Sequence, residues 1–159
     1  MTTANKTRAA MLLAAALALP MPAVMAVDTD DDPAASQLDP DYAAGKKAID
    51  WKDWETAIRR LSSAALRDTR NADIQNYLGY SYRNSGQMDL AFKHYARALE
   101  LNPRHRGAHE YVGEAYLLVS DLPKAEQHLA ALQKICLLPC DEYAELKKQI
   151  DVYRQRAAK

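Results

Sequence analysis

Two cysteines, Cys136 and Cys140, have the spacing that most readily suggests chemistry in this 159-residue chain. A C-x3-C pair can place two thiolates side by side, and soft thiolate ligands favour Cu(I). In an oxidising compartment the same pair forms a disulfide instead. No methionine lies near the pair in sequence, the histidines are far along the chain, and there is no C-x-x-C redox motif. We therefore expect a disulfide, with a metal (copper) carrier or a redox protein as the alternative.

The histidines offer little support for a metal or catalytic site. His94 and His128 are 34 residues apart, and a metal shared between neighbouring helices is conceivable, but no carboxylate or cysteine joins them at ligand spacing. We read them as exposed polar residues. His109-Glu110 begins like a zinc-peptidase motif, but Gly113 stands where the second histidine would be.

Other catalytic signatures are missing as well. The sequence contains neither a glycine-rich phosphate loop nor a Gly-x-Ser-x-Gly elbow. We therefore predict a protein that is not an enzyme, with no catalytic residues, no metal site and no cofactor.

Residues 1–26 have the layout of a secretory signal. Lys6 and Arg8 precede the apolar stretch Ala9–Leu19, and Val24-Met25-Ala26 places small residues where a signal peptidase reads. The apolar stretch is too short to span a bilayer. We expect cleavage after Ala26 and no stable membrane insertion afterwards.

Residues 27–37 follow as an acidic stretch. It contains Asp28, Asp30, Asp31 and Asp32 and has little to bury, which is typical of a flexible leader. Export implies an oxidising compartment, and we expect the bacterial periplasm. A carrier or redox protein using the cysteines would then be periplasmic too.

Composition narrows the class of protein further. Lys plus Arg and Asp plus Glu are balanced at 21 each, which argues against a nucleic-acid partner. The chain is 48% hydrophobic, as expected for a globular protein, and its 5 glycines and 7 prolines are too few for a turn-rich sandwich or barrel. The composition favours helices.

Gly45, Gly79 and Gly113 recur at intervals of 34 residues, and alanines at 57, 91 and 125 have the same spacing. Such a fixed period indicates a repeat architecture. Within one period the apolar residues have helical spacing, and a turn separates two runs. Each period therefore predicts a helical hairpin whose small residues let two helices cross closely.

The middle period carries a recognisable pattern. Leu78-Gly79, Tyr82, Ala91, Tyr95, Ala98 and Pro103 resemble the tetratricopeptide repeat at the right offsets, although its usual tryptophan position holds Gln75. The resemblance implies an all-α fold, a right-handed α-α superhelix of three helix-hairpin repeats plus a C-terminal capping helix. We expect the repeats at 38–71, 72–105 and 106–139 and the cap within 140–159, where Asp141–Ala157 reads as a helix.

In this family the first helices of the repeats line a concave groove, so the resemblance implies a protein or peptide partner. The groove candidates are Tyr42, Lys46, Asn76, Tyr77, Tyr80, Arg83, Glu110, Tyr111 and Glu114. Tyrosine supplies contact area, asparagine can pair with a peptide backbone, and arginine can pair with a carboxylate. We expect Tyr42 and Tyr80 to face the groove, whereas Tyr77 and Tyr111 either face it or pack between helices.

The Lys/Asn/Arg clamp with which some members of the family hold an acidic C-terminus is absent, because Tyr42, Lys46, Tyr77, Gly107 and Tyr111 stand in its places. The sequence thus predicts an exported protein–protein interaction module with an adaptor or assembly role. The oligomeric state stays open, and a domain that works only as an oligomer is a further hypothesis.

Overall fold

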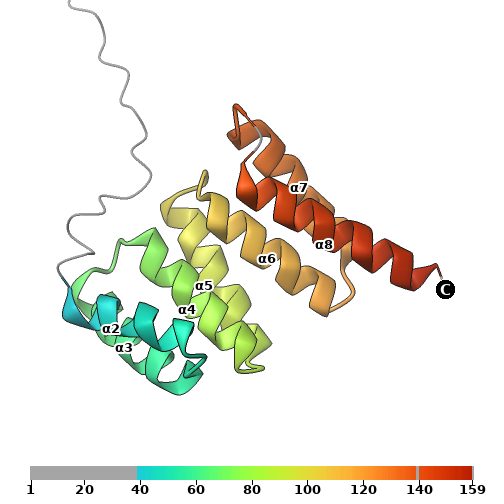
Figure 1. The fold of residues 1–159 in the computed structure, drawn as a ribbon. Helices are drawn as coiled ribbons and strands as arrows, with labels where there is room; N and C mark the ends of the chain where they lie inside the picture. Colours follow the sequence, from blue (N-terminus) through green and yellow to red (C-terminus); the bar gives the residue numbers. More distant parts are fainter. Residues whose placement is uncertain (1–38, 139, 159) are drawn as a thin grey trace, which may run out of the picture.

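The computed structural model describes residues 39–138 and 140–158. Within them the chain forms seven helices and no strand, which confirms the all-α expectation (Figure 1). The helices are α2 (Pro40–Asp50), α3 (Trp54–Arg67), α4 (Ala72–Asn84), α5 (Met88–Leu101), α6 (Arg106–Leu118), α7 (Leu122–Ile135) and α8 (Asp141–Ala157). The expected signal, 1–26, and acidic leader, 27–37, lie outside the described residues and stay predictions.

The helices from α2 to α7 are paired into three hairpins by turns of the same backbone conformation. Lys52, Gly86 and Ser120 occupy equivalent repeat positions, and their φ angles are 57°, 80° and 62°. This left-handed region suits glycine and is uncommon for other residues. The turn geometry has therefore kept its form in all three hairpins, although only the middle one has the residue that adopts it without steric cost.

Each hairpin shares its apolar core with the helix that follows it. One cluster joins Leu61 of α3 to Leu78 of α4, and the next joins Tyr95 of α5 to Val112 of α6. The last joins Leu132 of α7 to Leu146 of α8. No hairpin could bury both of its faces alone, so this continuous stacking is what stabilises the array.

The three period-defining glycines allow close helix crossings, but they do not all face the same partner. A Cβ atom on Gly45 would lie 2.6 Å from the Leu61 side chain, and one on Gly79 would lie 2.6 Å from the Tyr95 ring. In both cases the neighbour is the second helix of the same hairpin. A Cβ on Gly113 would instead meet Leu146 of α8 at 2.6 Å. The capping helix therefore rests directly on α6, and Figure 1 shows the two helices running side by side.

A polar pair also recurs in every hairpin. It joins a residue of the first helix to the residue 19 positions later, on the second helix. The three pairs are Asp41–Arg60 at 2.8 Å, Gln75–His94 at 2.8 Å and His109–His128 at 2.9 Å. The tryptophan position of the repeat pattern thus holds a polar residue in all three copies. Our reading of His94 and His128 as exposed residues is wrong, because both are half-buried and bonded to the first helix.

The two histidines of the third hairpin hold each other as neutral rings. Nε2 of His109 lies 3.1 Å from the carbonyl oxygen of Pro103 and donates to it, so its Nδ1 accepts from Nδ1–H of His128. Burial lowers the pKa of both imidazoles, and burial together with the neighbouring His109 lowers that of His128 to about 4. Protonating both rings would place two N–H groups against each other.

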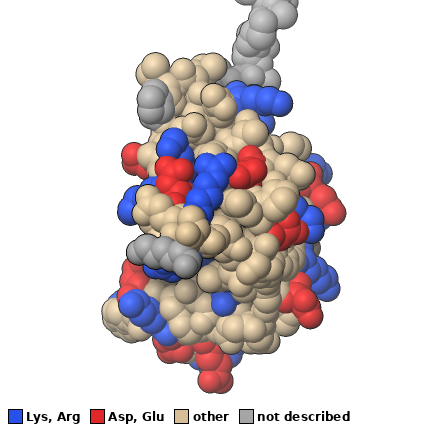
Figure 2. All heavy atoms as spheres, turned by 90° about the vertical axis from the view of Figure 1, so that its right-hand side faces the viewer, with Lys and Arg blue, Asp and Glu red and all other residues tan. Residues whose placement is uncertain are grey.

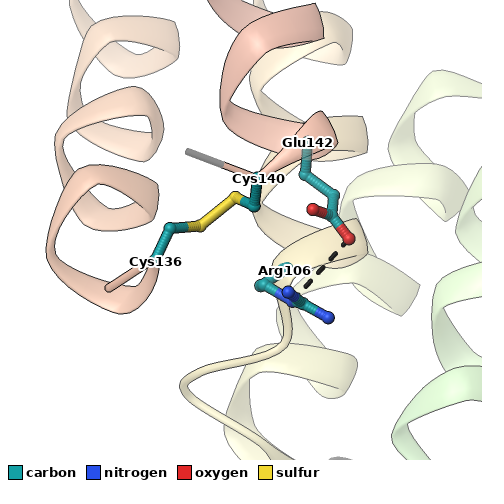
Figure 3. The surroundings of a disulfide bond; sticks show 4 residues. All are labelled: Arg106, Cys136, Cys140 and Glu142. Carbon is teal, nitrogen blue, oxygen red and sulfur yellow. Dashed lines mark ion pairs between the residues drawn. A yellow bond between two sulfur atoms is a disulfide. The ribbon is translucent and has the colours of Figure 1, made fainter. Parts of the chain in front are cut away.

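A disulfide joins the end of α7 to the start of α8. It links Cys136, directly after α7, to Cys140, directly before α8 (Figure 3). Beside it, Arg106 at the start of α6 and Glu142 in the first turn of α8 point toward one another, with Nε and Oε1 3.7 Å apart. The start of the capping helix is therefore tied to both helices of the third hairpin.

The surface carries charges of both signs and a few exposed apolar side chains. Acidic and basic side chains are interspersed on the face shown in Figure 2. Leu137 and Leu138, within the disulfide loop, are 95% and 80% exposed. None of the helices in the described part of the chain combines the length and the apolar character needed to cross a membrane.

Candidate functional site

Two hollows lie where α4 and α6 meet α8. The first, which we call the Asn76 cavity, has a volume of about 260 Å³ and lies at the N-terminal ends of these helices. Its walls are formed by Asp73, Asn76, Tyr77, His105, Arg106, Gly107, Glu110, Tyr111 and Glu142. The second, about 340 Å³, lies at their C-terminal ends and includes Arg83, Glu114 and Tyr153. The first helices of two repeats and the capping helix thus build both hollows.

The amide of Asn76 is the least satisfied polar group of the first cavity. The residue is 3% exposed, and its Oδ1 has no hydrogen-bond partner among the described residues. A Cβ on Gly107 would lie 3.2 Å from Nδ2, so the glycine leaves room for this amide. A buried carbonyl without a donor costs about 1–3 kcal/mol.

Glu110 contributes a second unpartnered acceptor to the same cavity. It is half-buried, and the described part of the chain gives it neither a hydrogen bond nor an ion pair. Burial, followed by the nearby carboxylates of Glu114, Glu142 and Glu145, raises its pKa to about 7. The negative charge of the cavity is therefore under-compensated at Glu110.

Two other carboxylates of the cavity have partners. His105 caps α6 by accepting from the backbone N–H of Ala108 at Nδ1, 3.1 Å away, so its Nε2 carries a proton. That Nε2–H donates to Oδ1 of Asp73 at 3.0 Å. Glu142 lies opposite Arg106, as described above. These pairs fix the rim of the cavity and leave Glu110 without a partner among the described residues.

The predicted groove tyrosines form two groups, each with a cation against the rings. Nζ of Lys46 lies 5.6 Å from the ring centre of Tyr42 and 5.2 Å from that of Tyr77. Cζ of Arg83 lies 5.1 Å from the ring centre of Tyr80 and 5.6 Å from that of Tyr111. Contacts of this kind contribute about 0.5–1 kcal/mol at exposed sites and more when buried. The tyrosines are therefore held in place before any ligand arrives.

Arg83 is held within the chain through one nitrogen of its guanidinium. Its Nη1 donates to Oε2 of Glu114 at 2.6 Å and to the carbonyl oxygen of Tyr111 at 3.1 Å, and the side chain is 9% exposed. It fastens α4 to α6 and also lines the second hollow. Pairing of Arg83 with a partner's carboxylate stays a prediction.

The remaining candidates divide into those that line a hollow and those that do not. Asn76, Tyr77, Glu110 and Tyr111 meet around the Asn76 cavity, and Glu114 lies in the second hollow with Arg83. Lys46 is exposed on α2, outside both hollows, and Tyr80 is half-buried. Binding by any of these residues stays a prediction.

The structure corrects the prediction for Tyr42. We expected it to face the groove, but it is 5% exposed and belongs to the core shared by α2, α3 and α4. Its position in the first turn of α2 brings its ring 6.0 Å from that of Tyr77, so the ring packs between neighbouring first helices.

Sequence reasoning missed Trp54, Gly107 and Glu142. Trp54, at the start of α3, packs its ring edge-on against Tyr80 at 6.0 Å. Glu142 belongs to the capping helix, which a repeat pattern cannot place against α6. Of the three, Gly107 alone carried a signal, because a glycine in the first turn of a helix invites a close approach.

Residues 72–105 match the family model of the tetratricopeptide repeat. The match covers one of the three hairpins, the one formed by α4 and α5. The matched segment runs from the start of α4 to the loop after α5, so it carries Asn76, Tyr77 and Tyr80. This confirms the resemblance found in the sequence.

Among curated proteins, the chain is similar to the protein O-mannosyl-transferase TMTC3 of Homo sapiens and of Mus musculus. Each is 27% identical over 94 residues, or 58% of this chain. The matched part is 10% of the length of either transferase. The similarity therefore concerns a small segment of those proteins.

Solved structures with tetratricopeptide-like folds match most of the chain. The type III secretion translocator chaperone SycD of Yersinia enterocolitica superposes with a TM-score of 0.68 at 16% identity, covering 79% of this chain and 88% of SycD. SycD in complex with a peptide of the translocator YopD gives 0.65 at 17% identity, covering 80% and 99%. PcrH in complex with the chaperone-binding region of PopD gives 0.66 at 17%, covering 80% and 96%. At these identities the likeness establishes the fold.

The cysteines form a disulfide in this structure and so present no thiolate, which is the form that binds a metal. Within residues 39–138 and 140–158, no three or more histidine, cysteine, aspartate or glutamate side chains are grouped to hold a metal ion.

Proposed function

We propose that the chain is an exported, non-enzymatic adaptor that binds a segment of a partner protein along the face of α4 and α6, next to α8. The observation that carries this proposal is a cavity between α4, α6 and α8 that is lined by the buried residue Asn76 and walled by two pre-positioned tyrosines. A polypeptide segment offers backbone donors and acceptors together with apolar side chains, which suit such a cavity.

The comparisons support the proposal at the level of the fold. Two of the similar structures are chaperones in complex with a peptide or region of another protein. Export rests on the signal-like residues 1–26 and agrees with a disulfide in the chain. We therefore propose the bacterial periplasm as the compartment in which the protein acts.

The test is a selection of peptides from a random library displayed on phage, using the purified wild-type protein as the target. Selected peptides are then measured by calorimetry against wild type, Gly107→Leu and Gln127→Leu. The first variant fills the Asn76 cavity from the first turn of α6. The second places the same leucine on an exposed position of α7.

We expect Gly107→Leu to weaken binding by about tenfold or more, corresponding to about 1.4 kcal/mol, and Gln127→Leu to leave it unchanged. Circular dichroism confirms that both variants keep their helices. A library that yields no binder, or binders indifferent to Gly107→Leu, would refute the proposed site.

A further inference from the structure

The Cys136–Cys140 disulfide is not the only link between the capping helix and the third hairpin. It joins residues four positions apart, and closing so short a loop restricts the unfolded chain little. Leu146 of α8 packs in the core that it shares with α7, and Arg154 of α8 pairs with Glu126 of α7 at 2.7 Å. The bond can therefore open while α8 stays docked on the hairpin.

The bond is accessible from the side of Cys136. This cysteine lines a surface cavity of about 210 Å³ together with Gln133, Leu137, Leu138 and Tyr143. The two leucines are 95% and 80% exposed, so the apolar wall of the cavity is open to solvent. Of the two cysteines, Cys136 is the one in this wall. A group seated in the cavity therefore approaches the disulfide at Cys136.

The two sulfurs lie at opposite ends of two helices, and this makes them chemically unequal (Figure 3). Cys140 is the N-cap residue of α8, a helix of 17 residues with no side-chain hydrogen bond at its N-cap. A helix N-terminus stabilises a thiolate and lowers the pKa of its thiol. Cys136 is the C-cap residue of α7, where a thiolate would face the negative end of the helix dipole. Cys140 is therefore the better leaving group of the pair.

Two acids in the first turn of α8 oppose this effect, and both are weakened. Glu142 faces Arg106, with Oε1 and Nε 3.7 Å apart, so part of its charge is offset. Asp141 is exposed, and water screens its charge. The asymmetry between the two helix ends therefore remains.

We propose that the disulfide captures a cysteine of a partner protein by thiol–disulfide exchange at Cys136. The partner's thiolate attacks Sγ of Cys136 and forms a new S–S bond with it. The bond between Cys136 and Cys140 breaks, and its electron pair leaves on Sγ of Cys140 as a thiolate. The step needs no external oxidant, and attack by the Cys140 thiolate on Cys136 releases the partner again.

The cavity also sets a preference for the surroundings of the captured cysteine. Leu137, Leu138 and Tyr143 offer apolar contacts, so a cysteine with apolar neighbours fits better than one between polar or small residues. The inference goes beyond the proposed function, because this cavity and the Asn76 cavity have no lining residue in common.

Two single-cysteine variants test the inequality of the sulfurs. Cys136→Ser keeps the thiol at the start of α8, and Cys140→Ser keeps the thiol at the end of α7. The rate of alkylation by iodoacetamide is measured against pH for each, after circular dichroism has shown that both keep their helices. We expect the Cys140 thiol to titrate at least about one pH unit below the Cys136 thiol. Equal midpoints, or the reverse order, would overturn the inference.

The capture itself is tested on the wild-type protein with two acetylated and amidated tripeptides, Leu-Cys-Leu and Gly-Cys-Gly, each in large excess. The reaction is quenched with acid and the protein is digested with pepsin, since exchange stops without thiolate. Tandem mass spectrometry then shows which cysteine carries the tripeptide. The matched variants are Leu138→Ser in the cavity and Leu66→Ser, which removes a leucine on α3 that is 82% exposed.

We expect the tripeptide on Cys136, and we expect Leu-Cys-Leu to be captured about tenfold or more faster than Gly-Cys-Gly. Leu138→Ser should reduce this preference, and Leu66→Ser should leave it unchanged. A tripeptide on Cys140, no mixed disulfide at all, or equal capture rates for the two tripeptides would refute capture at this cavity.

Discussion

Replacing Glu110 by glutamine should stabilise the protein at pH 8 and leave its stability unchanged at pH 4. The pKa of this carboxyl rises from an ordinary value of 4.5 to about 7, chiefly because it is half-buried and secondly because Glu114 and Glu142 lie nearby. The native state thus holds this proton more tightly than the unfolded chain does. The contribution of Glu110 to the free energy of unfolding therefore falls as the pH rises from 4.5 to about 7 and is constant above.

The size of the effect follows from the two pKa values. One pH unit between them corresponds to about 1.4 kcal/mol, so the ionised carboxylate costs the native state at most about 3 kcal/mol. Water reaches part of the side chain and screens the neighbouring charges, which reduces the expected gain to about 1–2 kcal/mol. Glutamine keeps the shape and has no charge to bury.

Urea unfolding followed by circular dichroism at pH 4, 6 and 8 measures this difference directly. Glu100→Gln is the matched control, because it removes an exposed carboxylate paired with Arg97 and should change stability by less than about 0.5 kcal/mol. If Glu110→Gln were no more stable than wild type at pH 8, or equally stabilised at pH 4, the account of an uncompensated carboxylate would be wrong.

Three further predictions concern the array itself. Gly79→Ala should lower the free energy of unfolding by about 1–3 kcal/mol, because its Cβ would lie 2.6 Å from the Tyr95 ring, and an unchanged urea midpoint would contradict this. The double change Cys136→Ala and Cys140→Ala should lower the free energy of unfolding by about 2 kcal/mol on the chain-entropy model, and it should speed amide exchange in the first turns of α8. Unaltered protection of those amides would contradict this. Burial lowers the pKa of His128 to about 4, so this residue should reduce the free energy of unfolding by about 1–2 kcal/mol between pH 7 and pH 4.5. His128→Gln should lack this reduction, and parallel pH profiles of wild type and variant would disprove the prediction.

The repeat period was sufficient to predict the hairpins, because a 34-residue interval between small residues has few structural meanings. Gly45 and Gly79 sit against the second helix of their own hairpin, as expected. Gly113 has the same sequence signal and a different neighbour. Here α8, a helix outside the repeats, packs directly against α6. A periodic pattern contains no information about the contacts of such a helix.

The prediction for the histidines was wrong for a different reason. His94 and His128 were considered as a pair with each other, since they share a repeat position. Their true partners, Gln75 and His109, also share a repeat position, and the two sets are 19 residues apart. Comparing polar residues across the two helices of each hairpin would have found them. The buried Asn76 carbonyl was beyond reach, because whether an amide finds a donor depends on side-chain positions that spacing does not determine.

The way α8 rests on α6 has a consequence for any polypeptide that follows the first helices along the array. Both hollows are bounded on one side by α8, at Glu142 in the first and at Tyr153 in the second. A partner segment that runs along the first helices from α2 reaches the wall that α8 forms at these hollows. Its route therefore ends or bends there, which favours a chain terminus or a turn over the middle of a long straight stretch.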